Sequence, residues 1–315
     1  MANQVFGIIN TQNTCFMNSV LQVLLNIPEL RNQVKEKDND HPLFQAFKKI
    51  VLYWERNTES RQVLLKSLCQ AVYEHLHFRR GEQQDAHEFF YKFIDHLHEL
   101  TKQDVVLTAK QNNRNTALVE CEQAWNKFCR NNYSAIISTF YAQCKNTITC
   151  PCSHQSLNRE QHCGIMVDVA EHLSDSIEQY FKGQVIDGYK CESCHTRQRV
   201  SQQRRIEVLP EVLVIQVNRF LDNNFKNNKV LPFTHELDLG LYVEPDLGTH
   251  HIQYKLVGMV CHYGSLLNSG HYNVVFKHND GHWYIADDEH VRQIKQVSMQ
   301  QMGSTAYMFF YRRVQ

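Results

Sequence analysis

The 315-residue sequence predicts an α+β fold, with helices gathered in its first part and strands in its second. Up to about residue 130, apolar residues recur at the three- and four-residue spacing of helices that bury one face. Near Phe140 this periodicity gives way to paired cysteines, glycines and alternating residues, which indicate strands. Runs of helices followed by runs of strands are typical of the α+β class.

Composition and charge exclude several classes of protein. With 43% hydrophobic and 21% charged residues, the chain can bury a substantial core. A formal net charge of zero and a pI near 7.3 give no reason to expect a nucleic-acid partner. The apolar runs are too short to cross a membrane, and the first seven residues lack the features of a signal peptide.

The cysteine count bears on both compartment and chemistry. Eleven is an odd number, and no secretion signal accompanies it, so a disulfide framework is not expected. We therefore predict a reducing compartment, the cytoplasm or the nucleus. There, clustered cysteines indicate a metal, and an isolated cysteine with a distant histidine indicates catalysis.

The first predicted helix covers residues 16–25 and places Cys15 in its first turn, with Thr14 as the expected N-cap. Unpaired N–H groups and the positive end of the helix dipole favour a thiolate at this position. Cys15 is thus a candidate nucleophile. The alternative is an unreactive cysteine buried at a helix start.

Further helices follow in the N-terminal part. Periodic apolar residues predict helices after Pro42 and over residues 63–76, and these serve the core. The clearest helix begins near residues 84–89, Gln-Asp-Ala-His-Glu-Phe, where acidic residues in the first turn complement the helix dipole. Residues 101–117 are polar and are expected to form a loop, after which helical spacing resumes over 118–128.

The second part of the chain is predicted to be mostly strand, apart from a short helix over 175–181. Residues 212–217 are apolar except for one glutamine, and this composition predicts a strand that is buried on both faces. Three more segments have the alternation or β-rich composition of strands, namely residues 254–261, 271–277 and 307–312.

Two pairs of cysteines predict a structural zinc site. Cys191 and Cys194 have the two-residue gap that lets both sulfurs reach one tetrahedral Zn²⁺. Their expected partners are Cys150 and Cys152, although a one-residue gap is tighter than usual. Three other residues are alternatives for one member of that pair: Cys144, His154 and Cys163. Reduced cysteines without a metal are the competing interpretation.

A candidate catalytic histidine lies far from Cys15 in the sequence. His271 begins one predicted strand, and Asp287 and Asp288 end another after a turn at residues 279–281. Antiparallel pairing of these strands would bring a carboxylate beside His271, where it orients the imidazole and stabilises its charged form. The alternative is an ordinary surface or core histidine.

Several separated blocks of the sequence together resemble the ubiquitin-specific proteases, which are papain-like cysteine peptidases. Residues 10–22 are similar to the family's cysteine box, and residues 270–272 with 283–291 are similar to its histidine box. Residues 84–89 match the block between them. The transition from zinc-bearing fingers to palm is matched by residues 189–194, 206–213 and 218–220.

The resemblance implies a role for each site residue. Cys15 would be the nucleophile, His271 the general base and acid, Asp287 the orienting carboxylate with Asp288 as its alternative, and Asn10 the oxyanion donor. Ubiquitin's C-terminal tail would be contacted by Gln84, Asp85 and Tyr272. Zinc would be structural, and no catalytic cofactor is implied.

The resemblance also implies a single catalytic domain with three subdomains. The helical thumb would cover residues 1–135, the fingers 136–205 and the β-rich palm 206–315. The implied activity is hydrolysis of the bond after the C-terminal glycine of ubiquitin, by a monomer. The alternatives are the same reaction on another ubiquitin-like modifier, or a catalytically silent ubiquitin-binding scaffold.

The sequence departs from the family pattern in two places. Gln12 stands where the family usually has a glycine, in the loop that shapes the oxyanion site. A glutamine tolerates positive φ poorly, so this loop is expected to be strained or rearranged. If the change distorts the approach to Cys15, activity is expected to be low until Gln12→Gly restores the loop. The second departure is the Cys150–Cys152 pair, which is one residue shorter than the family's pair.

Overall fold

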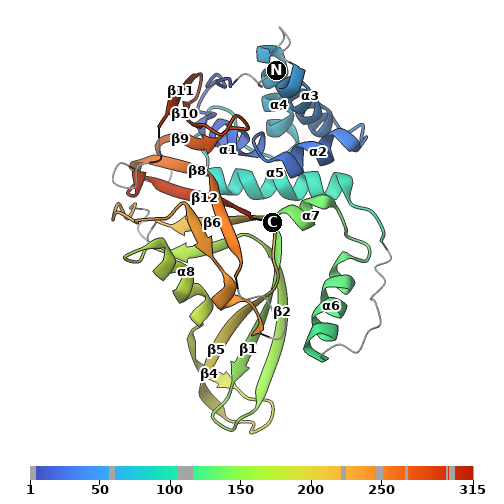
Figure 1. Cartoon of the computed structure of the whole chain (residues 1–315), viewed down its shortest axis with the longest axis vertical. Coiled ribbons are helices and arrows are strands. Elements are labelled where there is room, and N and C mark those ends of the chain that lie inside the picture. Colours follow the sequence, from blue (N-terminus) through green and yellow to red (C-terminus); the bar gives the residue numbers. More distant parts are fainter. Residues whose placement is uncertain are drawn as a thin grey trace.

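The structure is a computed structural model that describes residues 5–56, 61–105, 116–220, 225–245, 251–266, 269–295, 297 and 302–314. Within these ranges, seven helices come before the first strand (Figure 1). They are α1 (Cys15–Leu24), α2 (Pro28–Glu36), α3 (Pro42–Arg56), α4 (Arg61–His75), α5 (Ala86–Thr101), α6 (Thr116–Cys129) and α7 (Ala135–Phe140).

The larger sheet has eight strands, in the order β11-β10-β9-β8-β12-β6-β3, with β7 paired to β8. All neighbours are antiparallel except β3 and β6, which are parallel. The strands are β3 (Ile165–Asp168), β6 (Val212–Asn218), β7 (Glu236–Asp238), β8 (Gln253–Leu266), β9 (Ser269–Lys277), β10 (Trp283–Asp287), β11 (His290–Ile294) and β12 (Ala306–Arg313).

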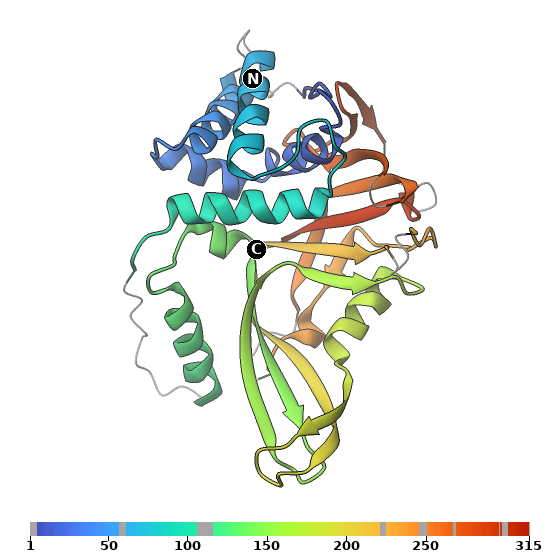
Figure 2. The ribbon, with the colours of Figure 1, turned by 180° about the vertical axis from the view of Figure 1, so that it is seen from behind.

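The smaller sheet extends away from the helices as a separate projection (Figures 1 and 2). Its four antiparallel strands have the order β2-β1-β5-β4. They are β1 (Tyr141–Thr149), β2 (Gln155–Cys163), β4 (Val185–Lys190) and β5 (Arg197–Val208). Helix α6 stands beside this sheet, and Gln143 of β1 donates a hydrogen bond to the carbonyl of Cys121 in α6 at 3.1 Å.

Hydrophobic cores lie on both faces of the larger sheet. Val212 and Val214 of β6 belong to the core shared with α1, α3 and α5. Leu213, Ile215 and Val217 of the same strand belong to the opposite core, which includes α8 (Leu173–Lys182) and residues near η1 (Gly240–Tyr242). The prediction of a strand buried on both faces at 212–217 is therefore confirmed.

Helix α1 packs directly on the sheet through a glycine of β8. A Cβ atom on Gly258 would lie only 2.7 Å from a methyl carbon of Val23 in α1. Alanine or any larger residue at this position would therefore push the helix outward. This close approach sets the height of α1, and of Cys15 at its first turn, above strands β8 and β9.

Most predicted elements are confirmed, with two local differences. The strands at 254–261, 271–277 and 307–312 correspond to β8, β9 and β12, and the helix at 118–128 to α6. Thr14 precedes α1 as expected, but its side chain does not cap the helix. The predicted 175–181 helix begins earlier, after His172, where Asp175 accepts from the backbone of His172.

Two further predictions concern a loop and the absence of membrane-spanning segments. Of the predicted loop at 101–117, residues 106–115 lie outside the described residues. Across the part of the chain that the structure describes, we find no helix with the length and hydrophobicity needed to span a bilayer. The boundaries of thumb, fingers and palm stay a prediction.

Candidate active site

The fold brings Cys15 and His271 together, although 256 positions separate them in the sequence. Cys15 is the first residue of α1 and is 3% exposed. His271 lies on β9, the strand on which α1 packs, and its side chain forms a hydrogen bond with that of Cys15. A thiol and an imidazole in this contact can exchange a proton, which is what nucleophilic catalysis by cysteine requires.

Asp287 orients the imidazole from the neighbouring strand. His271 Nε2 lies 2.5 Å from Asp287 Oδ1, because β9 and β10 pair in antiparallel register. The hydrogen bond with Cys15, and after it the bond with Asp287, raises the pKa of His271 to about 9, against the opposing effect of burial. The charged imidazolium is thus favoured in the folded protein.

Asp288 has a different set of partners and does not substitute for Asp287. Its Oδ2 accepts a hydrogen bond from Asn10 Nδ2 and its Oδ1 accepts one from Asn18 Nδ2, each at 2.8 Å. Burial raises the pKa of Asp288, while the bonds from Asn18 and Asn10 act in the opposite direction. Asp288 therefore fixes Asn10, the predicted oxyanion donor, to the end of β10.

The loop before Cys15 adopts the backbone conformation that a glycine would favour. Gln12 and Asn13 have φ angles of 62° and 65°, in the left-handed region. The loop is nevertheless closed by internal hydrogen bonds, from Thr14 N to Asn10 Oδ1 at 2.9 Å and from Thr11 N to Thr14 Oγ1 at 3.0 Å. Gln12 thus has the strained backbone conformation that the sequence predicts, in a loop whose hydrogen bonds hold Asn10 and Thr14 together.

Three residues were predicted to contact the substrate tail, and the structure places two of them in internal contacts. Asp85 Oδ1 accepts from the N–H groups of His87 and Glu88 and so caps α5, while its Oδ2 accepts from the hydroxyl of Tyr307 at 2.5 Å. Tyr272 is 3% exposed and packs against the ring of His262. Gln84 is half-buried beside them.

Two residues near this site were not anticipated. Asn18, one turn into α1, holds Asp288, and Gln83 makes two hydrogen bonds to the backbone of Gly270, the residue before His271. The adjacent glutamines at 83 and 84 were the available signal for Gln83. For Asn18 the signal was a polar residue within the otherwise apolar start of α1.

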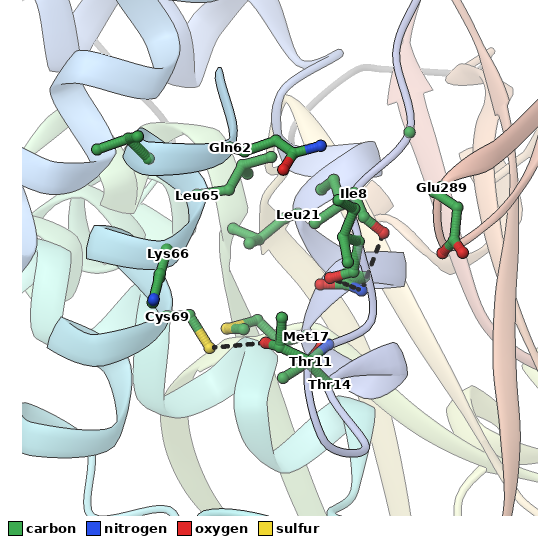
Figure 3. Close-up of a pocket in the computed structure, with 14 residues that line it drawn as sticks. Ile8, Thr11, Thr14, Met17, Leu21, Gln62, Leu65, Lys66, Cys69 and Glu289 are labelled. Carbon is green, nitrogen blue, oxygen red and sulfur yellow. Dashed lines mark hydrogen bonds between the residues drawn. The ribbon is translucent and has the colours of Figure 1, made fainter. Parts of the chain in front are cut away.

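A cavity of about 600 Å³ lies between the N-terminal segment, α1 and α4 (Figure 3). Thr11 and Thr14 of the loop line it together with Leu65 and Cys69 of α4, and Thr11 Oγ1 lies 3.9 Å from Cys69 Sγ. Because close packing is missing on this side, the position of the loop depends largely on its hydrogen bonds.

The four predicted metal ligands form one cluster where the β1–β2 and β4–β5 hairpins turn. Their sulfurs lie within 4.8 Å of one another, with 3.9 Å between Cys150 and Cys194 and 3.7 Å between Cys152 and Cys191. Sulfurs bound to one tetrahedral Zn²⁺ lie about 3.8 Å apart, because each Zn–S bond is about 2.3 Å long. The cluster therefore fits a structural zinc ion.

The short Cys150–Cys152 spacing is accommodated by a tight turn. Ser153 N donates to the carbonyl of Cys150 at 2.8 Å, and Ser153 has a φ of 68°. The proposed alternatives lie outside the cluster. Cys144 is buried, and its Sγ lies 3.8 Å from Nε2 of His162. The carbonyl of Cys163 accepts a hydrogen bond from the hydroxyl of Tyr91. His154 contributes its backbone carbonyl to Cys150 N, rather than a ligand.

Comparison with known sequences and structures identifies similar proteins. The family model described as ubiquitin carboxyl-terminal hydrolase matches residues 6–311. Proteins called ubiquitin carboxyl-terminal hydrolase 36 from Drosophila erecta and Drosophila simulans are each 28% identical over 97% of this chain. The chain spans only 28% and 31% of the length of these two relatives.

Solved structures share the fold across almost the whole chain. The Ubp8/Sgf11/Sus1/Sgf73 module of SAGA, described as a DUB module and bound to ubiquitin aldehyde, matches with a TM-score of 0.79 and 26% identity. The match covers 99% of this chain and 70% of the other. A structure of the yeast SAGA DUB module matches with a TM-score of 0.78. The papain-like α+β fold predicted from the sequence is thus confirmed.

Proposed function

The chain belongs to the ubiquitin carboxyl-terminal hydrolase family, and we propose on that basis that it is a cysteine-type deubiquitinase. The reaction is hydrolysis of the bond that follows the C-terminal glycine of ubiquitin, whether to a lysine side chain or to a following peptide. The observation that carries this proposal is the contact of Cys15 with His271, which is in turn held by Asp287.

The first step forms a thioester. His271 takes the thiol proton of Cys15, and the sulfur attacks the carbonyl carbon of the terminal glycine. The resulting oxyanion is stabilised by N–H donors in the loop before Cys15. The side-chain amide of Asn10 has two N–H groups, and one of them donates to Asp288. In this mechanism the other N–H group donates to the oxyanion. His271 then gives its proton to the departing amine as the C–N bond breaks.

The second step releases ubiquitin. A water molecule takes the place of the amine, His271 removes one proton from it, and the hydroxide attacks the thioester carbonyl. The C–S bond breaks, the free carboxylate leaves, and the thiol–imidazole pair is restored. Asp287 keeps the imidazole in one orientation through both proton transfers.

Ubiquitin is the proposed partner of the chain. Support comes from the structurally similar Ubp8 module, which has been solved with ubiquitin aldehyde and with monoubiquitin. The four cysteines of the smaller sheet would bind a zinc ion, and this ion would hold the tips of two hairpins together. Because the cluster lies outside the active site, the zinc would add rigidity to the sheet and would take no part in the reaction.

The proposal is tested with ubiquitin that carries a C-terminal propargylamide, which reacts covalently with an active-site thiol. Intact mass is measured for the wild type, for Cys15→Ala and for Cys69→Ser, a half-buried thiol outside the reacting set. We expect one ubiquitin adduct in the wild type and in Cys69→Ser, and none in Cys15→Ala.

The same probe distinguishes the alternatives. Matched propargylamide probes of other ubiquitin-like modifiers are run in parallel. Reaction with one of those alone would replace ubiquitin as the substrate. Ubiquitin binding without an adduct would show a silent scaffold, and an adduct that persists in Cys15→Ala would remove Cys15 as the nucleophile.

We further propose that the protein works in a reducing compartment, the cytoplasm or the nucleus. All eleven cysteines are described, and each is free of disulfide bonds, which supports this assignment. Fractionation of cells that express the tagged chain tests it. Recovery in a secreted or lumenal fraction would contradict it.

A further inference from the structure

The short segment 81–83, just before α5, touches both halves of the active site. It lies between α4 and α5 in sequence, and it belongs to neither the loop of Cys15 nor the strand of His271. Asn13, two residues before Cys15, contacts it at one end, and Gly270, one residue before His271, contacts it at the other. A single segment thus spans the gap between nucleophile and base.

The contact at Gly270 is unusually complete. Gln83 Nε2 donates to the carbonyl of Gly270 at 2.6 Å, and Gln83 Oε1 accepts from the N–H of Gly270 at 2.6 Å. One side-chain amide therefore satisfies both backbone groups of one residue, as a neighbouring β-strand would. Two such bonds restrict both the position and the orientation of the peptide units beside His271.

Gly270 itself has little freedom to move away. A Cβ atom at this position would come within 2.2 Å of the carbonyl oxygen of Tyr263 and 2.5 Å of Nε2 of His262. The glycine is thus pressed against β8 on one side and held by Gln83 on the other. A displacement of Gly270 would be passed directly to His271, the next residue on the strand.

The contact at the other end is simpler. Asn13 Nδ2 donates to the carbonyl of Gly81 at 2.8 Å, and this bond is exposed to solvent. Asn13 has a φ of 65°, a left-handed conformation that asparagine adopts more readily than most residues. An exposed neutral hydrogen bond is worth less than a half-buried bidentate one, so this end is the weaker of the two.

We propose that segment 81–83 is a strut that sets the spacing between Cys15 and His271, with Gln83 as the positioning residue for His271. It acts through its hydrogen bonds to Asn13 and to the backbone of Gly270, the residues that flank the reacting pair. Asp287 fixes the orientation of the imidazole ring, whereas Gln83 fixes the backbone from which the ring projects. The strut rests on the proposed function only in naming Cys15 and His271 as the reacting pair.

The first test uses Gln83→Leu, which keeps a side chain of similar bulk and removes both hydrogen bonds. With ubiquitin–aminomethylcoumarin as substrate, we expect kcat to fall about 10-fold and KM to change less than about 2-fold, because misplaced groups slow the chemistry more than binding. The matched control is Gln70→Leu, an exposed glutamine of α4 that bonds only Glu74 of the same helix. Its kinetics should be those of the wild type.

The second measurement needs no ubiquitin. The rate of Cys15 alkylation by iodoacetamide is followed against pH, by intact mass, after the other accessible thiols are identified with Cys15→Ala. If Gln83 positions His271, the pH at which alkylation is half-maximal rises in Gln83→Leu and stays unchanged in Gln70→Leu. A lower Tm with an unchanged alkylation profile would show a purely structural role and would overturn the proposal.

A third variant separates the two hydrogen bonds. Gln83→Glu keeps an acceptor for the N–H of Gly270 but places a second carboxylate oxygen against the carbonyl. We expect its kcat and alkylation profile to lie between those of the wild type and Gln83→Leu. Full wild-type behaviour in both Gln83 variants would also overturn the proposal.

A double-mutant cycle tests whether the two contacts act as one strut. Asn13→Ala alone should lower kcat about 2- to 3-fold, because it removes one exposed bond. If the contacts act in series, the double variant Asn13→Ala/Gln83→Leu is no slower than Gln83→Leu alone. Fully multiplied effects would show two independent contacts. Because alkylation reports on Cys15 directly, inactivity toward ubiquitin would leave the alkylation measurement intact, and the same cycle can be run on alkylation rates.

Discussion

At the scale of single residues, two neighbouring carboxylates have different partners in the proposed active site. Asp287 contacts the imidazole of His271, and Asp288 contacts the amides of Asn10 and Asn18. In the proposed mechanism, Asp287 therefore supports proton transfer and the next residue, Asp288, supports the oxyanion donor. Their effects on the reaction should be separable by mutation.

Replacement of Asp288 by alanine is expected to lower kcat by about 10- to 100-fold, because Asn10 loses the acceptor that fixes its amide. The KM for ubiquitin–aminomethylcoumarin should change little. Asp288→Asn, which keeps one acceptor and so can hold only one of the two amides well, should fall between alanine and the wild type. Equal kcat values for Asp288→Ala and the wild type would show that Asn10 needs no support.

The titration of His271 should make stability depend on pH. Contact with Cys15 and Asp287 raises the pKa of His271 from 6.5 to about 9 in the folded protein. The resulting stabilisation is fully present below pH 6.5 and is lost as the pH rises through 9. Urea unfolding of the wild type and His271→Gln at pH 6.5, 8 and 9.5 should show a difference that shrinks with pH. A constant difference would contradict this assignment.

Gln12 is expected to cost stability rather than activity. A left-handed conformation is unfavourable for a residue with a Cβ, so Gln12→Gly should stabilise the protein by about 0.5 kcal/mol after its larger unfolded-state entropy is subtracted. Because the loop already holds Asn10 in place, kcat should change less than about 2-fold. Gln12→Ala, which keeps the Cβ, is the control for urea unfolding. A large rise in kcat with glycine would restore the idea of a misformed loop.

The proximity of the three proposed reacting residues could be predicted from the sequence, whereas the residues that hold them in place could not. Cys15, His271 and Asp287 lie in sequence blocks whose residue types indicate catalysis by a cysteine. The structure brings the three side chains together. Gln83 and Asn18 act through hydrogen bonds to residues more than 180 positions away, and nothing in their local spacing reveals such partners. Asp85 combines two predictions: its position at the start of α5 is confirmed by its side-chain cap, while its contact with the substrate tail stays a prediction.

At the scale of elements, the position of α1 on the sheet decides where Cys15 lies. Gly258 permits the close approach of α1 to β8, and Val23 fills the space over it. Periodicity predicted α1 and β8 separately and accurately. The distance between them depends on which glycine faces which valine, and that information appears only when both elements are placed.

Gly258→Ala is expected to destabilise the protein by about 1–3 kcal/mol, since the added methyl group overpacks the contact with α1. The displaced helix should also slow alkylation of Cys15. Adding Val23→Ala should recover part of both losses, because it removes the methyl groups that clash. Urea unfolding and alkylation kinetics of the single and double variants measure this. Failure of Val23→Ala to compensate would place the strain elsewhere.

At the scale of the whole molecule, the smaller sheet is held at its far end by the four-cysteine cluster and near its base by contacts with α6. Glu207 of β5 accepts from Arg159 of β2 at 2.9 Å and from Gln143 of β1 at 3.0 Å, and Arg159 also bonds Glu120 of α6. The base is thus a connected polar network, whereas the tip has only a small apolar cluster around Cys150, Cys191 and Val200.

Removal of zinc should therefore loosen the tip and spare the base. We expect one zinc per chain by elemental analysis, and a loss of most of it in Cys191→Ser. Hydrogen exchange should then accelerate in the β1–β2 and β4–β5 hairpins, with exchange in α1 and β9 unchanged. A purified wild type that lacks zinc and shows the same exchange in these hairpins would refute the metal site.

The order of strands in the larger sheet has a consequence for synthesis. Strand β12, near the C-terminal end of the described chain, lies between β8 and β6, so it joins the hairpins that carry His271 and Asp287 to the rest of the sheet. We expect that, before residues 306–313 have been synthesised, the strands that carry His271 and Asp287 cannot join the rest of the sheet. The proposed protease would therefore stay inactive until these residues have emerged from the ribosome.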